Sequence, residues 1–579
     1  MQQNKNIKDF SELKLIISDS EKMTSSLTDL TEIFNLKKHF SVFNGLKTKG
    51  YEVASILKIL LILPFYGASS IYALFKTGMN KQDFVGKKDI YYDIKNNENI
   101  DWRTLLLLHV KRFRYLVNTN KNIKSTGTTA IIFDDTKIEK TGKKIERVSM
   151  INDHVTGRFV LGFKLLVCGF WDGASFIPID FSLHREKGSK QEKLASTYKN
   201  AVKKEQSINS QYIKCQKILK KKENSLQKAQ ELCSKKNNTT HRNRLKKNES
   251  AFEKSKQNLD SIKKQLSEFK LLVAKYKTAV AKNYTKGTLY GLTLKERKEQ
   301  YKKPITKGSC GNIRRHETDI DKISNMIAML KRAVKNGIIA DYLLCDSWFF
   351  CFELLNQLQS LRNGVIKLVS MVKINNQIFT DINDRKMSVK KMPFIYSKNI
   401  QNCRKLKAKY IKIPCFYQGI RVNLFFIKMG KASAWHLILT NDLDMNFIQL
   451  MEVYQIRWSI EVFFKESKQY LNLDACQSSN FDGQIADITL SMIQHIMLSY
   501  LKRKNYMQSI GNLFQKLCKE VIEIDLITRL LEIFWKIIRL LCENSGFDFF
   551  EFQKDALNND DILRKLISII PEKSFDKAA

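Results

Sequence analysis

Proline is scarce in this sequence, with 6 in 579 residues, and so are glycine, with 23, and acidic residues, with 58 against 99 lysines and arginines. The scarcity of chain breakers excludes a collagen-like or low-complexity chain. The charge imbalance leaves a formal net charge of +41, far more than solubility requires. A surface of this kind needs a polyanionic partner, so we expect nucleic acid first and an anionic membrane second.

Paired cysteines are also missing. The 11 cysteines are scattered from Cys168 to Cys542, and they form neither a C-x-x-C pair nor a cluster with histidine at zinc-binding spacing. This pattern predicts a reducing compartment, the cytoplasm, and no structural zinc. The first residues, MQQNKNIKDFSELK, contain no apolar core of the kind that a signal peptide needs.

One apolar run, from Val53 to Phe75, is long enough to cross a bilayer. Lys58 lies within this run, Pro64 lies at its centre, and a Gly-Ala-Ser-Ser stretch divides it. These interruptions favour two buried helices of ordinary length, and a protein with no membrane partner. A transmembrane segment is the alternative.

Hydrophobic residues make up 43% of the chain, enough for large cores, and their spacing predicts an α/β protein with helical ends. Three apolar and aromatic runs look like an antiparallel meander: Ala130–Phe133, Phe159–Phe170 and Ser175–Leu183. A helix at Ile320–Lys335 and a short strand ending at Cys345 follow. The expected divisions are a helical N-terminal region (1–125), an α/β core in three pieces (126–186, 305–363 and 444–475), a basic helical insertion (187–304), a β-rich insertion (364–443) and a helical C-terminal region (476–579).

More than half of the net charge lies in the basic insertion, residues 187–304. This segment contains 32 lysines and arginines and 10 acidic residues, or +22 of the total. Its apolar residues keep heptad-like spacing in two runs, which the turn-forming residues 237–243 separate. We therefore expect an antiparallel coiled-coil hairpin with an apolar seam and a cationic outside, which would hold DNA phosphates without reading sequence.

Three acids stand out by position. Asp134 follows the apolar run AIIF, Asp346 follows YLLC, and Glu461 lies in the helical segment IRWSIEVFFKESKQYL. Carboxylates held at strand ends and on a helix are the hard oxygen ligands that Mg²⁺ prefers, with Mn²⁺ as a substitute. Two such ions would support an in-line phosphoryl transfer. The alternative for each acid is an ordinary surface or capping role.

These residues resemble the DDE transposases of bacterial insertion sequences, of the insertion sequence family four type. The resemblance covers roughly residues 85–475 and depends on a Tyr-x2-Arg-x3-Glu-x6-Lys signature. The signature is met by four residues of this chain: Tyr454, Arg457, Glu461 and Lys468. The D-x-T context of Asp134 and the LCDSWF context of Asp346 also match the family.

The spacing of the signature supports this interpretation independently. Steps of three, four and seven residues from Tyr454 through Arg457 and Glu461 to Lys468 place all four side chains on one face of a single α-helix. Such a face would hold a metal ligand beside groups that bind a DNA phosphate. For the first acid we prefer Asp134, because strand alternation would turn Asp135 to the other face of the sheet.

The resemblance implies a cut-and-paste transposase with an RNase H-like catalytic core, whose Asp134, Asp346 and Glu461 hold two Mg²⁺ ions. It implies that Tyr454, Arg457 and Lys468 bind DNA, and that the N-terminal helices recognise terminal inverted repeats. Trp435, in the β-rich insertion, would stack on a flipped base, with a buried core position as its alternative. The expected partners are transposon-end and target DNA and a second copy in a synaptic dimer, in the nucleoid. The rivals are a nuclease without strand transfer and a non-catalytic DNA-binding protein.

Overall fold

The computed structural model describes residues 26–548 and 551, apart from 48, 69, 78–85, 237, 286–288, 431 and 505–508. The N-terminal stretch tested for a signal peptide, and the helices expected after residue 551, lie outside the described residues. The chain divides into two compact units. Unit 1 comprises residues 1–136, 165–184 and 303–579, and unit 2 comprises 137–164 and 185–302.

Helices fill the described part of the N-terminal region, as expected. They are α2 (Ser26–Ile33), α3 (Leu36–Ser41), α4 (Val53–Ile62), α5 (Ile71–Thr77), α6 (Lys88–Lys95) and α7 (Trp102–Thr119). The apolar run is interrupted, as expected: α4 ends at Ile62, Pro64 lies in the 3-10 turn that follows, and Gly67 then adopts a left-handed conformation with a φ of 66°. In the described part of the chain no helix has the length and apolarity that crossing a membrane requires.

The sheet begins with the strands that the apolar runs predicted. They are β1 (Ala130–Glu139), β3 (Arg158–Trp171), β4 (Phe176–His184) and β5 (Tyr342–Cys345), together with β2 (Ser149–Asp153), which the sequence reading missed. Within the sheet, β3 lies between β4 and β1, and β5 and β6 (Lys367–Val372) follow on the other side of β1. The pairs β1–β5 and β5–β6 are parallel. The chain passes from unit 1 to unit 2 within β1 and back within β3.

The β-rich segment is not separate from this sheet. β6, which we expected inside an insertion over 364–443, pairs with β5 on one side and with β12 on the other. The insertion proper therefore begins after β6, because β6 continues the core sheet. The remaining strands and the short helix between them are β7 (Ile378–Asp381), β8 (Lys386–Ser388), α14 (Met392–Ile395), β9 (Gln401–Cys403), β10 (Ala408–Tyr417), β11 (Ile420–Met429) and β12 (His436–Thr440).

Unit 1 also contains several later helices. They are α11 (Cys310–Glu317), α12 (Lys322–Lys335), α13 (Phe352–Ser360), α15 (Phe447–Gln455), α16 (Trp458–Tyr470), α17 (Phe481–Lys504) and α18 (Ile510–Ser545). Most of α17 is buried on all sides, and its buried Gln494 donates a hydrogen bond to the Leu61 carbonyl at 2.6 Å. A helix buried around its circumference belongs to the centre of a core, and α17 contacts α4, α7, β4 and α16.

The single helix expected over residues 454–471 is two helices. α15 ends at Gln455 and α16 begins at Trp458. The turn between them keeps right-handed helical dihedrals but forms i→i+3 hydrogen bonds, for example from the Arg457 N–H to the Tyr454 carbonyl at 3.1 Å. The four signature residues therefore do not share one continuous helical face.

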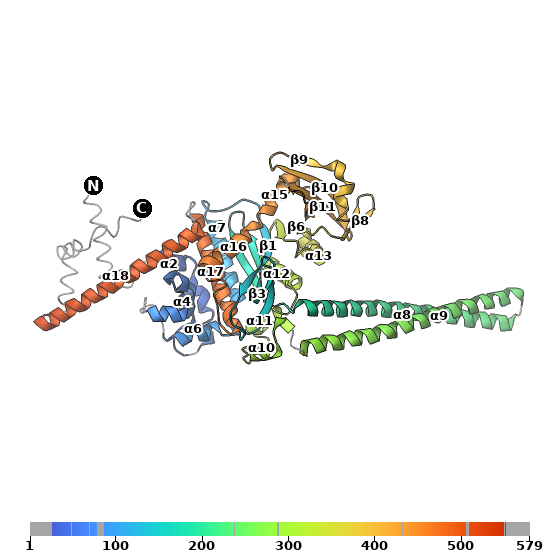
Figure 1. Cartoon of the computed structure of the whole chain (residues 1–579), viewed down its shortest axis with the longest axis horizontal. Helices are drawn as coiled ribbons and strands as arrows, with labels where there is room; N and C mark the ends of the chain where they lie inside the picture. Colours follow the sequence, from blue (N-terminus) through green and yellow to red (C-terminus); the bar gives the residue numbers. More distant parts are fainter. Residues whose placement is uncertain are drawn as a thin grey trace. The chain divides into compact units, whose positions relative to one another are not determined.

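Unit 2 consists mainly of two long paired helices, α8 (Ser189–Lys235) and α9 (Thr239–Thr285), followed by α10 (Leu294–Glu299). Figure 1 shows α8 and α9 running side by side. Three contacts set their register: Asn248 to Ser225, Asn258 to Cys215, and Lys204 over the Phe269 ring. The residue numbers of each pair add up to the same value, 473. The pairing is therefore antiparallel and keeps one register over much of its length, as the predicted hairpin requires.

Candidate active site

The parallel pairing of β1 with β5 brings the first two acids onto neighbouring strands. Phe133 pairs with Cys345, and Asp134 and Asp346 are the next residues on the two strands. β5 ends at Cys345, whereas β1 continues to Glu139, beyond the end that the sequence suggested. Asp134 therefore lies within β1, at the point where this strand extends past its partner and its side chains become half-buried.

Arg457 joins the first acid to the third. Its guanidinium donates from Nη1 to Asp134 Oδ2 at 3.1 Å and from Nη2 to Glu461 Oε1 at 2.5 Å. All three side chains are partly shielded, with 16% of Arg457, 18% of Asp134 and 33% of Glu461 exposed. One cation thus lies between two carboxylates that are 327 residues apart in sequence.

The surroundings of Asp134 favour its neutral form. Burial raises the pKa of the Asp134 carboxyl to about 7, although a hydrogen bond from the Asp135 backbone N–H at 2.8 Å and the Arg457 guanidinium oppose the shift. Burial therefore makes proton binding at this carboxyl more favourable than at an ordinary aspartate. A divalent cation that bound there would displace the proton.

The packing of α16 holds Glu461 toward β1. Ile460, Phe463 and Phe464 of this helix are buried. The Phe463 ring contacts Phe176 of β4 at 5.2 Å and His495 of α17 at 4.8 Å between centroids. Aromatic burial of this kind stabilises the position of a helix strongly. This packing fixes the helix that carries Glu461, which bonds to Arg457, and Lys468, which bonds to Thr136 of β1.

Two lysines contact the residues beside Asp134. Lys468 donates from Nζ to Thr136 Oγ1 at 2.9 Å, so the last signature residue lies close to the first acid motif. Asp135 forms an ion pair with Lys322 of α12 instead. The two adjacent aspartates therefore have different partners, as expected for neighbours on opposite faces of a strand. Sequence reasoning did not identify Lys322, because a lysine at the start of a helix carries no motif.

Tyr454 lies within the electrostatic field of the same cluster. Burial raises the pKa of its phenol, and so does the Asp346 carboxylate, whereas Arg457 lowers it. The Arg457 guanidinium carbon lies 5.8 Å from the centre of the Tyr454 ring. The structure therefore gathers Asp134, Arg457 and Glu461 by direct bonds, and it places Tyr454 and Asp346 beside them.

Two exposed tryptophans lie next to the motifs. Trp348 follows Asp346 by two residues and is 62% exposed, and Trp458 follows Arg457 directly and is 61% exposed. The ammonium of Lys373 lies over the Trp348 ring, 3.4 Å from its centre. Trp435, the tryptophan singled out by sequence, is half-buried before β12, with Lys428 4.6 Å from its ring centre. A search for aromatic residues beside the acid motifs would have found both exposed rings.

The donor set fits a hard divalent cation in its chemistry, because it consists of carboxylate oxygens and already surrounds one cation, the Arg457 guanidinium. Among the residues that the structure describes, no three His, Cys, Asp or Glu side chains are grouped closely enough to hold a metal ion.

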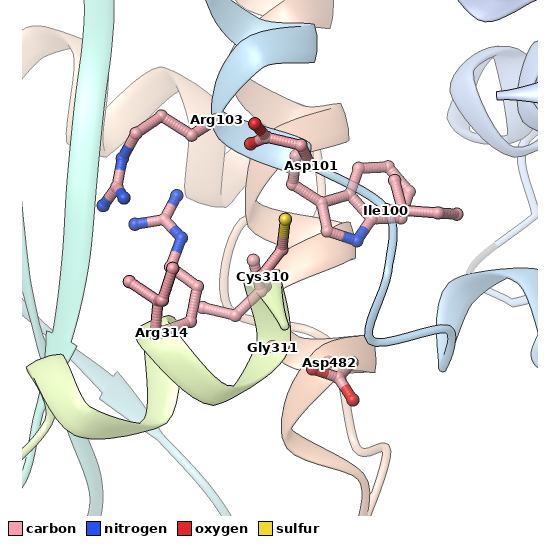
Figure 2. Close-up of a pocket in the computed structure, with 10 residues that line it drawn as sticks. Ile100, Asp101, Arg103, Cys310, Gly311, Arg314 and Asp482 are labelled. Atoms are coloured by element: carbon pink, nitrogen blue, oxygen red, sulfur yellow. The ribbon is translucent and has the colours of Figure 1, made fainter. Parts of the chain in front are cut away.

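A small cavity of about 100 Å³ lies among the first turns of α7, α11 and α17 (Figure 2). Arg103 and Arg314 approach each other on one side, and Asp482 lies below them (Figure 2). These charges are compensated: Arg103 bonds to Asp180 at 2.9 Å, and Asp482 bonds to Arg315 at 2.6 Å. The cavity lining contains none of the three acids. We interpret it as part of a buried ionic network that joins these helices.

The fold and the site together define an α/β protein in which one carboxylate from a parallel strand pair and one from a late helix bond to the same cation. Comparison with protein families matches residues 125–497, well over half of the chain, to the transposase DDE domain. The chain therefore belongs to the family of transposases that carry a DDE domain. No curated protein matches the chain.

Proposed function

We propose that the protein is a cut-and-paste DNA transposase that binds terminal inverted repeats, cleaves phosphodiesters and joins the freed 3′-OH to target DNA. One observation carries the proposal: in a member of this family, Arg457 bridges Asp134 and Glu461, and Asp346 follows the strand paired with that of Asp134. The strand order β4-β3-β1-β5-β6 supports an RNase H-like core.

Asp134, Asp346 and Glu461 would hold two Mg²⁺ ions, or Mn²⁺ in their place. When bound, the ions would activate the attacking oxygen and stabilise the leaving oxygen of an in-line displacement. The burial that raises the pKa of Asp134 supports this role, because it disfavours a bare negative charge there and a bound cation would compensate that charge.

Cations and aromatic rings around the acids would position the DNA. Arg457 has a planar fork that can leave the carboxylates and bind a phosphate bidentately, whereas Lys468 supplies a point charge beside Thr136. Tyr454 would donate a hydrogen bond to the same DNA strand. The exposed rings of Trp348 and Trp458 offer flat surfaces on which bases can stack, and Trp435 offers a half-buried one.

Strand cleavage tests the proposal most directly. We expect the purified protein to nick DNA that contains the element's ends when Mg²⁺ or Mn²⁺ is present, and Asp346→Asn to lose this activity by at least about 10³-fold. The matched control is Glu353→Gln, an exposed acid on nearby α13, which should cleave like wild type. Equal cleavage by wild type and Asp346→Asn would contradict the assignment of the acids.

A second assay separates a transposase from a nuclease of the same fold. The substrate is an end that is already cut and carries a free 3′-OH, mixed with a target plasmid. Joined products support the transposase. Cleavage without joining would favour the nuclease, and DNA binding without either reaction would favour a non-catalytic protein. Cross-linking of end-bound protein tests the synaptic dimer that we propose.

A further inference from the structure

The paired helices α8 and α9 carry charge well beyond what solubility needs. Each helix contains 12 lysines and arginines and 4 acidic residues, so the pair has a net charge of +16. Lys190 and Lys193 aside, the structure describes the exposure of all these basic side chains, and every one of them is exposed. Even if every acid formed an ion pair, two thirds of the cations would stay uncompensated.

The register of the pair explains why the charges all face outward. The antiparallel contacts keep a constant pairing, and apolar residues such as Ile208, Ala229 and Leu266 are buried along the seam. The seam takes up the apolar positions of both helices, so the remaining positions face solvent. The result is a cationic surface along both helices.

The length of this surface can be compared with duplex DNA. A helix of 47 residues is about 70 Å long, and about 70 Å of duplex DNA carries roughly 40 phosphates. The composition also decides how DNA is held, because 22 of the 24 cations are lysines and 2 are arginines. Lysine is a point charge that contacts phosphate, whereas reading of base edges relies on the fork of arginine or on amides.

We propose that α8 and α9 form a second DNA-binding surface that holds duplex DNA by its phosphates, whatever the sequence. This inference rests on the proposed function, which supplies DNA as the substrate, and extends it. The surface would bind DNA outside the terminal repeats, flanking or target duplex, while the carboxylate site acts on the ends.

Five lysines at one level of the pair provide the test. Lys220, Lys221 and Lys222 on α8 lie opposite the part of α9 that carries Lys254 and Lys256, according to the constant register. The test variant replaces all five with Gln, which keeps helix propensity but removes charge. The control variant replaces the same five with Arg, which keeps the charge. Circular dichroism confirms that both full-length variants retain their helices.

Binding is measured by fluorescence anisotropy with a duplex of about 30 base pairs that lacks terminal repeats, across a salt series and without divalent metal. The Gln variant should bind at least about tenfold more weakly at low salt, and its log–log salt slope should fall by up to about 4.5, since each lost phosphate contact removes ~0.9. The Arg variant should keep the wild-type slope.

An unchanged slope in the Gln variant would overturn the inference, and so would an equal loss in the Arg variant. Tight binding to phosphatidylserine vesicles that the Gln variant loses, with DNA binding intact, would assign the surface to a membrane instead. The assay needs no cleavage, so it is independent of the proposed reaction. Binding that depends on these lysines in a protein that never cuts DNA would overturn the proposed function and leave this inference standing.

Discussion

At the scale of single residues, the most informative contact is the pair of hydrogen bonds that Arg457 donates, one to Asp134 and one to Glu461. The guanidinium occupies the space between two carboxylates that would otherwise repel each other at close range. It therefore stabilises the metal-free site and competes with any divalent cation for the same oxygens. A DNA phosphate that attracts Arg457 would release both carboxylates, so DNA binding and metal binding should assist each other.

Replacing Arg457 should expose this competition. In Arg457→Gln, the affinity of the DNA-free protein for Mn²⁺ should rise by roughly tenfold, equivalent to ~1.4 kcal/mol, because no internal cation must be displaced. Titration calorimetry, or the loss of the free Mn²⁺ signal in electron paramagnetic resonance, measures this affinity. Lys405→Gln is the control, because it also removes one positive charge, but from a lysine that pairs with Glu452. Weaker Mn²⁺ binding in Arg457→Gln would contradict the expectation.

The adjacent aspartates of β1 should differ sharply in function. Asp134→Asn should abolish metal-dependent strand cleavage, because Asp134 and Glu461 both bond to the Arg457 guanidinium and together form the carboxylate site. Asp135→Asn should retain at least about a tenth of the activity, because Asp135 pairs with Lys322 on α12 and its loss leaves a half-exposed lysine. Single-turnover cleavage of end DNA distinguishes the two. The reverse order of effects would make Asp135 the first acid.

How far these residues were predictable depends on whether they belong to a spaced motif. Tyr454, Arg457, Glu461 and Lys468 were singled out by their fixed spacing, and Asp134 and Asp346 by their position directly after apolar runs; their roles stay predictions. The Arg457 bridge was not predictable, since it depends on the direction of one side chain across 323 residues of sequence. The exposure of Trp348 and Trp458 was missed because large aromatic residues are usually buried.

At the scale of elements, periodicity located the long helices and the apolar strands, but it failed where local geometry decides. β2 was missed because a five-residue strand with a half-buried pattern carries little signal. The break between α15 and α16 was missed because Ile456 and Arg457 keep helical dihedrals and only the hydrogen bonds change. β6 was assigned to an insertion because strand partners cannot be identified from one strand's composition.

α7 carries a pH-dependent contribution to stability. His109 is fully buried, and its Nδ1 lies 2.8 Å from the Leu105 carbonyl. Burial lowers the pKa of His109 to about 3, below its usual 6.5. Between about pH 3 and pH 6.5, His109 is protonated in the unfolded chain but neutral in the folded chain. Its contribution to the free energy of unfolding is therefore fully present above pH 6.5 and is lost as the pH falls.

When the pH falls from 7 to 5, His109 should lower the free energy of unfolding by roughly 2 kcal/mol, at about 1.36 kcal/mol for each pH unit below 6.5. Urea unfolding of wild type and His109→Gln at both pH values measures the effect, and the variant should lose less stability on acidification. His436→Gln, at an exposed position, should follow wild type. A steeper pH dependence in His109→Gln would refute the assignment.

At the scale of the whole molecule, the chain consists of two compact units, and the charge that dominated the composition is concentrated in one of them. The sequence predicted this concentration because charge counts need no structure. It did not predict that unit 2 also takes in residues 137–164, because the division falls within two strands, where no loop or linker marks a boundary.

Shortening the helical pair should leave unit 1 intact. The constant register allows residues 205–268 to be removed and replaced by a short Gly-Ser turn, so that Lys204 and Phe269 remain opposite each other. The main thermal unfolding transition and the cleavage of short end DNA should be unchanged, because unit 1 has its own core. A calorimetric scan checks the first expectation, and loss of that transition would show that the units fold as one.

The same pair also bears on how the chain reaches its native state. β1 must find β5 across more than 200 residues of sequence, and closing a long flexible loop is entropically costly and slow. The two ends of the segment that contains α8 and α9 lie close together, because the Tyr290 N–H donates a hydrogen bond to the Lys187 carbonyl at 3.2 Å. Once these helices have formed locally, the roughly 100 residues between Lys187 and Tyr290 no longer add to the flexible chain that must close before β1 pairs with β5. During synthesis, the long insertion would then delay pairing of the two strands far less than its length suggests.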